Sequence, residues 1–115
     1  MALNIDQLGD IDHVIGQWCL AKVPPNLKAE VDYDYEIEDQ SVLLLEVRPV
    51  WRGEPGQKTR RPFAKFRWIK SRQTWQIYWM RQNGKWHAYE PAGATCSLEE
   101  ALDVIEFDDY GCFFG

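Results

Sequence analysis

The sequence predicts an α+β fold, in which a helix at each end of the chain packs against a five-stranded antiparallel meander sheet. Three observations indicate this fold. Apolar residues recur every three or four positions over residues 5–20 and again over residues 98–107, a spacing typical of helices that bury one face. Between them, much of residues 31–90 alternates apolar and polar residues, as half-buried strands do. The chain has 115 residues and no internal repeat, so a single domain over residues 1–115 is expected.

The N-terminal helix is predicted over residues 5–20. The Pro24-Pro25 pair is expected to prevent its continuation, because proline cannot donate the hydrogen bond that extends a helix. Acidic side chains in the first turns agree with the positive end of the helix dipole at that point. The buried face of this helix is expected to consist of Leu8, Ile11, Val14, Ile15 and Trp18.

The first two strands are predicted to form a hairpin around a three-residue turn, Asp39-Gln40-Ser41. The first strand alternates from Val31 to Glu38, and the second, more apolar strand runs from Val42 to Trp51. The expected register pairs Ile37 with Leu43, Tyr35 with Leu45, Tyr33 with Val47, Asp34 with Glu46 and Asp32 with Arg48.

The other three strands are predicted over Phe63–Lys70, Trp75–Gln82 and Lys85–Glu90, after a polar loop over Arg52–Arg60. Asn83-Gly84 is predicted to be a type I′ turn, in which both central residues need a positive φ. The expected pairs are Trp68 with Trp75, Phe66 with Ile77, Ala64 with Trp79, Arg81 with Trp86, and Trp79 with Ala88.

The C-terminal helix is predicted to begin at a capping box. In Ser97-Leu98-Glu99-Glu100, the first and last side chains can accept hydrogen bonds from each other's backbone N–H groups. Helical spacing then continues to about Phe107. The last six residues, from Tyr110 to Gly115, are too apolar to remain in solvent, so this tail is expected to dock on the body of the protein.

Charge is distributed unevenly along the chain. From Arg48 to Lys85 there are 11 basic residues and one acidic residue, a net +10, whereas the remainder holds 2 basic and 17 acidic residues, a net −15. This polarity favours attraction of an anionic partner to one region while the whole chain stays acidic. The competing interpretation is internal neutralisation, with basic strands lying beside acidic ones.

The helices are expected to cover the tryptophan-bearing face of the sheet, which leaves the opposite face in solvent. Basic and aromatic side chains on such a face resemble the platforms on which single strands stack while their phosphates pair with cations. An ordinary amphipathic sheet, with lysine and arginine on its wet side, explains the same pattern. The hypothesised binding residues are Arg48, Lys65, Arg67, Tyr78, Lys85, His87 and Tyr89.

Two carboxylates, those of Asp34 and Glu46, are expected to lie opposite each other, with Arg48 on the same face. Nucleases use such acids to hold Mg²⁺ or Mn²⁺, while a nearby cation stabilises developing negative charge. A cross-strand charge ladder that tunes strand pairing is the other interpretation. No metal ligand is assigned, and no cofactor is expected.

Composition excludes several classes of protein. With 45% hydrophobic and 27% charged residues, the chain is expected to be globular rather than disordered. It has no apolar run near 18 residues and no signal-peptide pattern, so neither a membrane span nor secretion is expected. The three cysteines, Cys19, Cys96 and Cys112, show no CxxC spacing, which favours a reducing, cytoplasmic location.

Five short motifs occur in order between Pro24 and the last residue. They are Glu46-Val-Arg-Pro-Val-Trp51, Ala64-Lys65, Trp75-Gln-Ile-Tyr-Trp79, Lys85-Trp-His-Ala-Tyr-Glu-Pro91 and Gly111-Cys-Phe-Phe-Gly115. In these motifs the chain resembles a family of small, uncharacterised bacterial proteins described as a domain of unknown function. The resemblance implies a free-standing bacterial cytosolic domain, and it implies no activity and no functional residues.

Three functions remain open. The first is a non-enzymatic module that binds an anionic partner, either a single-stranded nucleic acid or an acidic protein surface, on one sheet face. The second is a protein-interaction or assembly module, including a homodimer, because aromatic and arginine side chains are common interface anchors. The third is a metal-dependent hydrolase or nuclease built on the Asp34 and Glu46 pair.

Overall fold

The computed structural model describes residues 3–50, 53, 56–91, 93–108 and 111–114. Its helical elements are α1 (Ile5–Asp10), the π-helix η1 (Ile11–Ile15), α2 (Gly16–Lys22), the 3₁₀ turn η2 (Pro25–Leu27) and α3 (Leu98–Phe107). Its strands are β1 (Asp32–Glu38), β2 (Ser41–Pro49), β3 (Lys58–Ile69), β4 (Thr74–Met80), β5 (Trp86–Ala88) and β6 (Ala94–Thr95).

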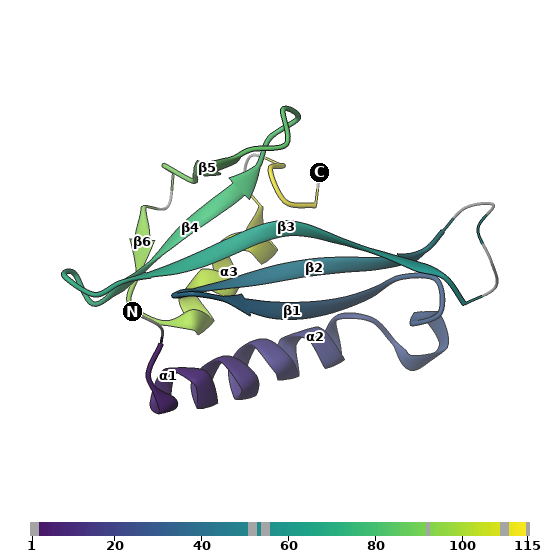
Figure 1. The fold of residues 1–115 in the computed structure, drawn as a ribbon, viewed down its shortest axis with the longest axis horizontal. Helices are drawn as coiled ribbons and strands as arrows, with labels where there is room; N and C mark the ends of the chain where they lie inside the picture. Colours follow the sequence, from purple (N-terminus) through teal and green to yellow (C-terminus); the bar gives the residue numbers. More distant parts are fainter. Residues whose placement is uncertain (1–2, 51–52, 54–55, 92, 109–110, 115) are drawn as a thin grey trace.

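The strands form one antiparallel sheet in the order β1-β2-β3-β4-β5, and the short β6 returns to pair with β4. The predicted α+β class and five-stranded meander are therefore confirmed, whereas β6 was not predicted. Helix α3 packs behind the sheet, and the α1–α2 segment runs along its β1 edge (Figure 1). No helix in the described part of the chain is long and apolar enough to cross a membrane.

The N-terminal helical segment is continuous from Ile5 to Lys22 but changes its winding in the middle. Asn4 caps its start, since the Asn4 side chain accepts from the Gln7 N–H at 2.8 Å. The π-helical turn brings both Ile11 and Ile15 into the core with no exposed surface. Leu8, which was expected in the buried face, is instead 38% exposed, because α1 buries none of its residues and the first buried residues of the helical segment lie in the π-helical turn.

The register of the first hairpin differs from the prediction by one residue. The turn has two residues rather than three, with Glu38 opposite Ser41 and Asp39 in the left-handed region (φ 54°). A shift of one residue moves each partner side chain to the other sheet face. Tyr33 therefore lies opposite Glu46, and Asp34 lies opposite Leu45.

The pairing of β3 with β4 follows the predicted register, including Phe66 with Ile77. Strand β3 begins at Lys58, inside the predicted loop. It also contains a bulge, because Leu44 pairs with Ala64 while Leu45 pairs with Pro62. The extra residue, Phe63, joins the core side of the sheet, and its ring lies 5.7 Å from the ring of Tyr33.

The hairpin between β4 and β5 forms at the predicted position but with a different turn. Arg81 and Lys85 close a three-residue loop through an N–H to O contact of 3.1 Å. Gly84 has a positive φ of 75° and Asn83 does not, as in a type I turn followed by a glycine bulge. Trp86 therefore pairs with Met80 rather than with Arg81, and His87 pairs with Trp79.

The C-terminal helix and the tail close the core. Ser97 caps α3 as predicted, accepting from the Glu100 N–H at 3.1 Å. The other half of the predicted capping box differs, because the Glu100 carboxylate accepts from the Cys96 N–H at 3.3 Å rather than from the Ser97 N–H. At the other end, the Asp108 carboxylate accepts from the N–H groups of Phe113 (3.0 Å) and Phe114 (2.7 Å). The Phe113 ring lies 5.0 Å from the Tyr89 ring. Docking of the tail is thus confirmed for residues 111–114, and the remainder of the predicted tail lies outside the described residues.

Asp108→Gly is expected to lower the free energy of unfolding by about 1 kcal/mol, because two charge-assisted hydrogen bonds to the tail are lost at a partly exposed site. Glycine tolerates the left-handed backbone at this position (φ 45°), so the substitution tests the carboxylate rather than backbone strain. Urea unfolding measures the difference. Asp103→Ala is the control, because glycine at this position would itself destabilise the interior of α3. Asp103→Ala is expected to change the free energy of unfolding by less than about 0.5 kcal/mol.

Candidate binding face

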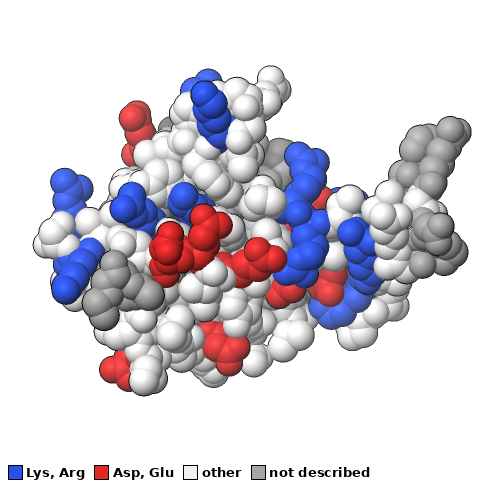
Figure 2. All heavy atoms as spheres, in the orientation of Figure 1, with Lys and Arg blue, Asp and Glu red and all other residues white. Residues whose placement is uncertain are grey.

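The sheet face turned away from α3 is called the outer face here. It carries acidic side chains on β1 (the acidic row) and basic side chains on β3 (the basic row), with apolar side chains of β2 between them. Figure 2 shows acidic side chains gathered near the middle of this side of the molecule, with basic side chains to either side. The strand registers place on it Asp32, Asp34, Glu36 and Glu38 of β1, Leu43, Leu45 and Val47 of β2, Arg60, Lys65 and Arg67 of β3, Gln76, Tyr78 and Met80 of β4, and Trp86 of β5.

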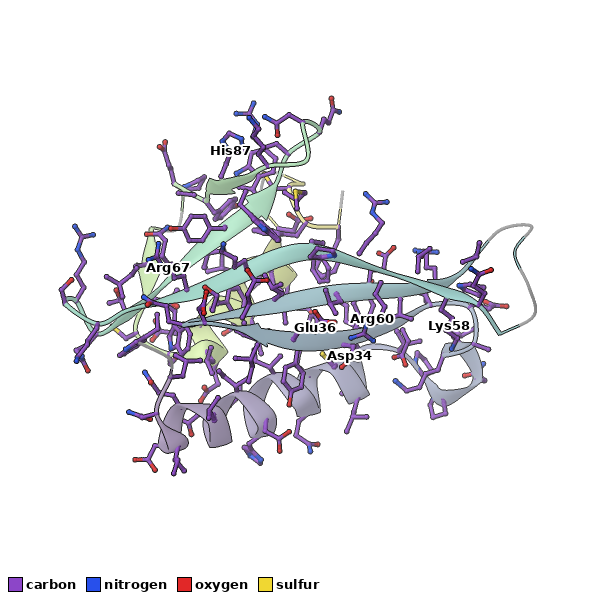
Figure 3. All side chains as sticks on the ribbon, in the orientation of Figure 1. Asp34, Glu36, Lys58, Arg60, Arg67 and His87 are labelled. Carbon is purple, nitrogen blue, oxygen red and sulfur yellow. The ribbon has the colours of Figure 1, made fainter. Side chains whose placement is uncertain are left out.

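One end of the basic row is neutralised within the protein. Arg60 reaches across β2 and donates to Asp34 at 2.8 Å and to Glu36 at 3.1 Å (Figure 3). The hydrogen bond to Asp34, followed by that to Glu36, raises the pKa of Arg60. Leu45, in the strand that Arg60 crosses, is only 3% exposed although it belongs to the outer face. Internal neutralisation, one of the two interpretations of the charge pattern, therefore holds at this end.

The other end of the basic row is not neutralised in this way. The Lys65 ammonium lies over two aromatic rings, 5.2 Å from the centre of the Tyr78 ring and 5.5 Å from that of Trp86. Within the described residues, neither Lys65 nor Arg67 has a carboxylate oxygen within 4.0 Å. Lys65, Arg67, Tyr78 and Trp86 together are called the Lys65 patch.

The structure brings some of the hypothesised binding residues together. Lys65, Arg67 and Tyr78 share the outer face, and Lys85 lies exposed at the end of the nearby β4–β5 hairpin.

Three other hypothesised residues lie elsewhere, so their predicted placement is wrong. Arg48 is on the opposite side of β2, where its Nε donates to Glu46 at 2.6 Å. Tyr89 is 3% exposed and packs in the core. His87 lies opposite Trp79, on the side away from the Lys65 patch. The one-residue shifts of the two hairpins account for Arg48 and His87, and the tail that covers Tyr89 accounts for its burial.

Trp86 is the aromatic residue of this face that the sequence analysis missed. It occupies the place predicted for His87, because the three-residue loop shifts β5 by one position. The Asn83-Gly84 pair does not distinguish the predicted two-residue type I′ turn from the observed three-residue loop, since glycine adopts a positive φ in both. The error therefore could not be detected from these residues alone.

The proposed pair of carboxylates is not formed. Asp34 lies opposite Leu45 on the outer face, whereas Glu46 lies opposite Tyr33 on the core side, and each acid has its own arginine partner. Among the residues that the structure describes, no group of three or more histidine, cysteine, aspartate or glutamate side chains could hold a metal ion. This geometry removes the basis for the metal-dependent hydrolase hypothesis.

Two of the three thiols, those of Cys19 and Cys112, show no activation for nucleophilic chemistry. Burial, with neighbouring acidic residues adding to it, raises the pKa of Cys19 to about 12. Burial also raises the pKa of Cys112, and Asp108 adds to that effect. A raised pKa keeps a thiol protonated near neutral pH, and the protonated thiol is the unreactive form.

The fold and the outer face define a small α+β protein, with helices along one edge and one face of a sheet and a mixed acidic, basic and aromatic surface on the other. The chain belongs to the family described as a domain of unknown function (DUF3024), whose model matches residues 4–115. No curated protein and no solved structure matches the chain. The predicted resemblance to an uncharacterised family is thereby confirmed.

Proposed function

We propose that this protein is a small binding module that takes an anionic partner on the outer face, and that the partner is a single-stranded nucleic acid. The observation that carries the proposal is the position of Lys65, whose ammonium lies over the rings of Tyr78 and Trp86 without a carboxylate partner among the described residues. A cation beside two rings offers one group for a phosphate and two for bases.

The contrast along β3 supports this assignment of the binding surface. Arg60 is occupied by Asp34 and Glu36, so a ligand would have to displace two ion pairs to use it. Within the described part of the chain, the Lys65 ammonium contacts aromatic rings and no carboxylate, and a cation–π contact at a partly exposed site contributes only about 0.5–1 kcal/mol. A phosphate can therefore pair with the Lys65 ammonium without breaking an ion pair.

The acidic row of β1 limits how a strand can lie on this face. Asp34, Glu36 and Glu38 belong to the same face and carry three negative charges against the single positive charge of Arg60, so this row still repels a phosphate backbone. A single strand would therefore follow β3, β4 and β5 rather than cross the whole sheet. Bound in this way, it would make few phosphate contacts, so the proposal includes weak binding that depends only modestly on salt, in proportion to that small number of contacts.

The test is fluorescence anisotropy of a fluorescein-labelled single-stranded oligonucleotide, DNA or RNA, titrated at several salt concentrations. Lys65→Gln is expected to reduce the slope of log K against log salt by about 0.7, the value for one phosphate contact on a single strand. Trp86→Leu is expected to weaken binding by about 1–3 kcal/mol without changing that slope, because it removes stacking and not charge. The two variants therefore separate charge from stacking.

Arg72→Gln is the matched control, since it removes one positive charge from the turn between β3 and β4, away from the Lys65 patch. It is expected to leave the affinity almost unchanged. No oligonucleotide binding at low salt would overturn the nucleic-acid proposal. Binding of a labelled poly-glutamate peptide through Lys65, without binding of an oligonucleotide, would identify an acidic protein as the partner instead.

A further inference from the structure

The sheet splits at one end, and the split leaves a cleft. Strands β3 and β4 pair as far as Ala64 and Trp79. Beyond that point β3 pairs with β2 through Pro62 and Arg61, while β4 leads into the β4–β5 hairpin. The bulge at Phe63 marks the point of separation, and bulges re-aim the side chains of the strand that contains them.

The C-terminal tail fills part of this split and leaves a cleft of about 380 Å³. That volume is within the usual range of small-molecule sites, about 300–1,000 Å³. Arg61 lines the cleft from β3, and Arg81 lines it from the end of β4. Phe63, Met80 and Phe113 supply apolar and aromatic surface. Two cationic side chains therefore border a cleft that also has apolar and aromatic surface.

Both arginines are available to a ligand. Within the described residues, neither Arg61 nor Arg81 has a carboxylate oxygen within 4.0 Å. The Arg81 guanidinium lies 5.4 Å from the centre of the Trp79 ring, a contact that restrains it without neutralising it. Arginine is suited to carboxylates and phosphates because its planar group can donate two parallel hydrogen bonds to either.

Among the described residues that line the cleft there is one acid, Glu46, and it is already paired. The Glu46 carboxylate accepts from Arg48 Nε at 2.6 Å, so its repulsion of an incoming anion is reduced. The balance of charge at the cleft therefore remains positive.

We propose that this cleft binds a small organic anion, with its phosphate or carboxylate group between Arg61 and Arg81 and an aromatic or other apolar group against Phe63 and Phe113. This site is separate from the Lys65 patch, and its ligand is a small molecule rather than a strand. The proposal for the cleft thus goes beyond the proposed function, and each of the two proposals can hold without the other.

Calorimetric titration with phenyl phosphate and with phenylacetate tests the proposal. Arg61→Gln and Arg81→Gln are each expected to weaken binding about tenfold or more, as loss of a charge-assisted hydrogen bond does. Arg61→Lys, which keeps the charge but lacks the planar group, is expected to recover only part of the affinity. Arg72→Gln, outside the cleft, is expected to bind as the unchanged protein does, and so is Lys65→Gln.

Cys112 offers a second readout, because it also lines the cleft and is half-buried. Cys96 is exposed and Cys19 is buried, so a Cys96→Ser background leaves Cys112 as the accessible thiol. At alkaline pH, where part of the Cys112 thiol is ionised despite its raised pKa, phenyl phosphate is expected to slow alkylation of Cys112 in that background, and Arg81→Gln is expected to abolish the protection. Since no oligonucleotide is involved, this result is independent of the test of the Lys65 patch.

Comparing phenyl phosphate with phenylacetate shows whether the cleft prefers a phosphate ester or a carboxylic acid. Stronger binding of phenyl phosphate assigns a phosphate ester, and stronger binding of phenylacetate assigns a carboxylic acid. Phenol, which lacks the anion, and inorganic phosphate, which lacks the ring, are both expected to bind at least tenfold more weakly. Binding that Arg61→Gln and Arg81→Gln leave unchanged, or no binding of either anion, would overturn the proposal.

Discussion

Phe66→Ala is expected to lower the free energy of unfolding by about 3–5 kcal/mol, the range for removing a buried phenylalanine side chain. Phe66 has no exposed surface and lies at the centre of the sheet, between Val42 of β2 and Ile77 of β4, which are also fully buried. Backbone hydrogen bonds hold β2 and β4 in place on either side of β3. The neighbouring side chains therefore cannot move in to fill the space left by the missing ring. The cost therefore includes a cavity as well as the lost transfer of apolar surface from water.

Urea unfolding followed by circular dichroism measures this difference. Ile37→Ala is a matched control because Ile37 pairs with the same Val42 but is 43% exposed, and it is expected to cost less than about 1 kcal/mol. If Phe66→Ala does not fold, Phe66→Leu gives a measurable value, expected at about 1–2 kcal/mol. Equal losses for Phe66→Leu and Ile37→Ala would contradict the assignment of Phe66 to the core.

Tyr35 is expected to make stability depend on pH between about 10 and 12. Its hydroxyl donates to the Asp12 carboxylate at 2.7 Å, joining β1 to the π-helical turn. This hydrogen bond, with burial adding to it, raises the pKa of Tyr35 from 10 to about 12. Because the folded pKa is the higher one, the contribution is complete below pH 10 and is lost as the pH rises toward 12.

The comparison of the unchanged protein with Tyr35→Phe isolates this contribution. The difference between a pKa of 10 in the unfolded chain and about 12 in the folded protein corresponds to about 2.7 kcal/mol of stability, and partial exposure to solvent reduces this contribution to roughly 1–2 kcal/mol. At pH 8 the unchanged protein is expected to be more stable by that amount, and at pH 11 the difference is expected to be about half as large. Asp12→Asn, which keeps an acceptor but removes the charge, is expected to reduce the pH dependence. A difference that stays constant from pH 8 to 11.5 would show that the hydrogen bond does not control the titration.

Local patterns in the sequence were sufficient for the order and type of the main elements. The alternation in β1, the spacing in the N-terminal helix and the cap at Ser97 each depend on neighbouring residues, and the structure has all three elements. The pairing of Phe66 with Ile77 was also predictable, since only one register keeps the large apolar residues of β3 and β4 on one face. By contrast, β6 has two residues, too few for a pattern to be visible.

The candidate site was less predictable, because each error of one residue in a turn moves a side chain across the sheet. The two-residue turn at Asp39 separates Asp34 from Glu46, and the three-residue loop ending at Gly84 exchanges Trp86 for His87. Lys65, Arg67 and Tyr78 were placed correctly on one face, since they lie in the two strands whose register was correct. The cleft between Arg61 and Arg81 had no counterpart in the sequence analysis.

The sequence by itself determined the α+β class, the order of the five-stranded meander, the cap at Ser97 and the unequal charge of its strands, because these follow from side chains close together along the chain. Only the tertiary structure decided which charges are neutralised. Arg60 meets Asp34 and Glu36 across an intervening strand, while Arg61 and Arg81 face a cleft that exists because a bulge, a hairpin and the chain's own tail meet there. Contacts of this kind join residues that are 20 or more positions apart, so no local pattern records them.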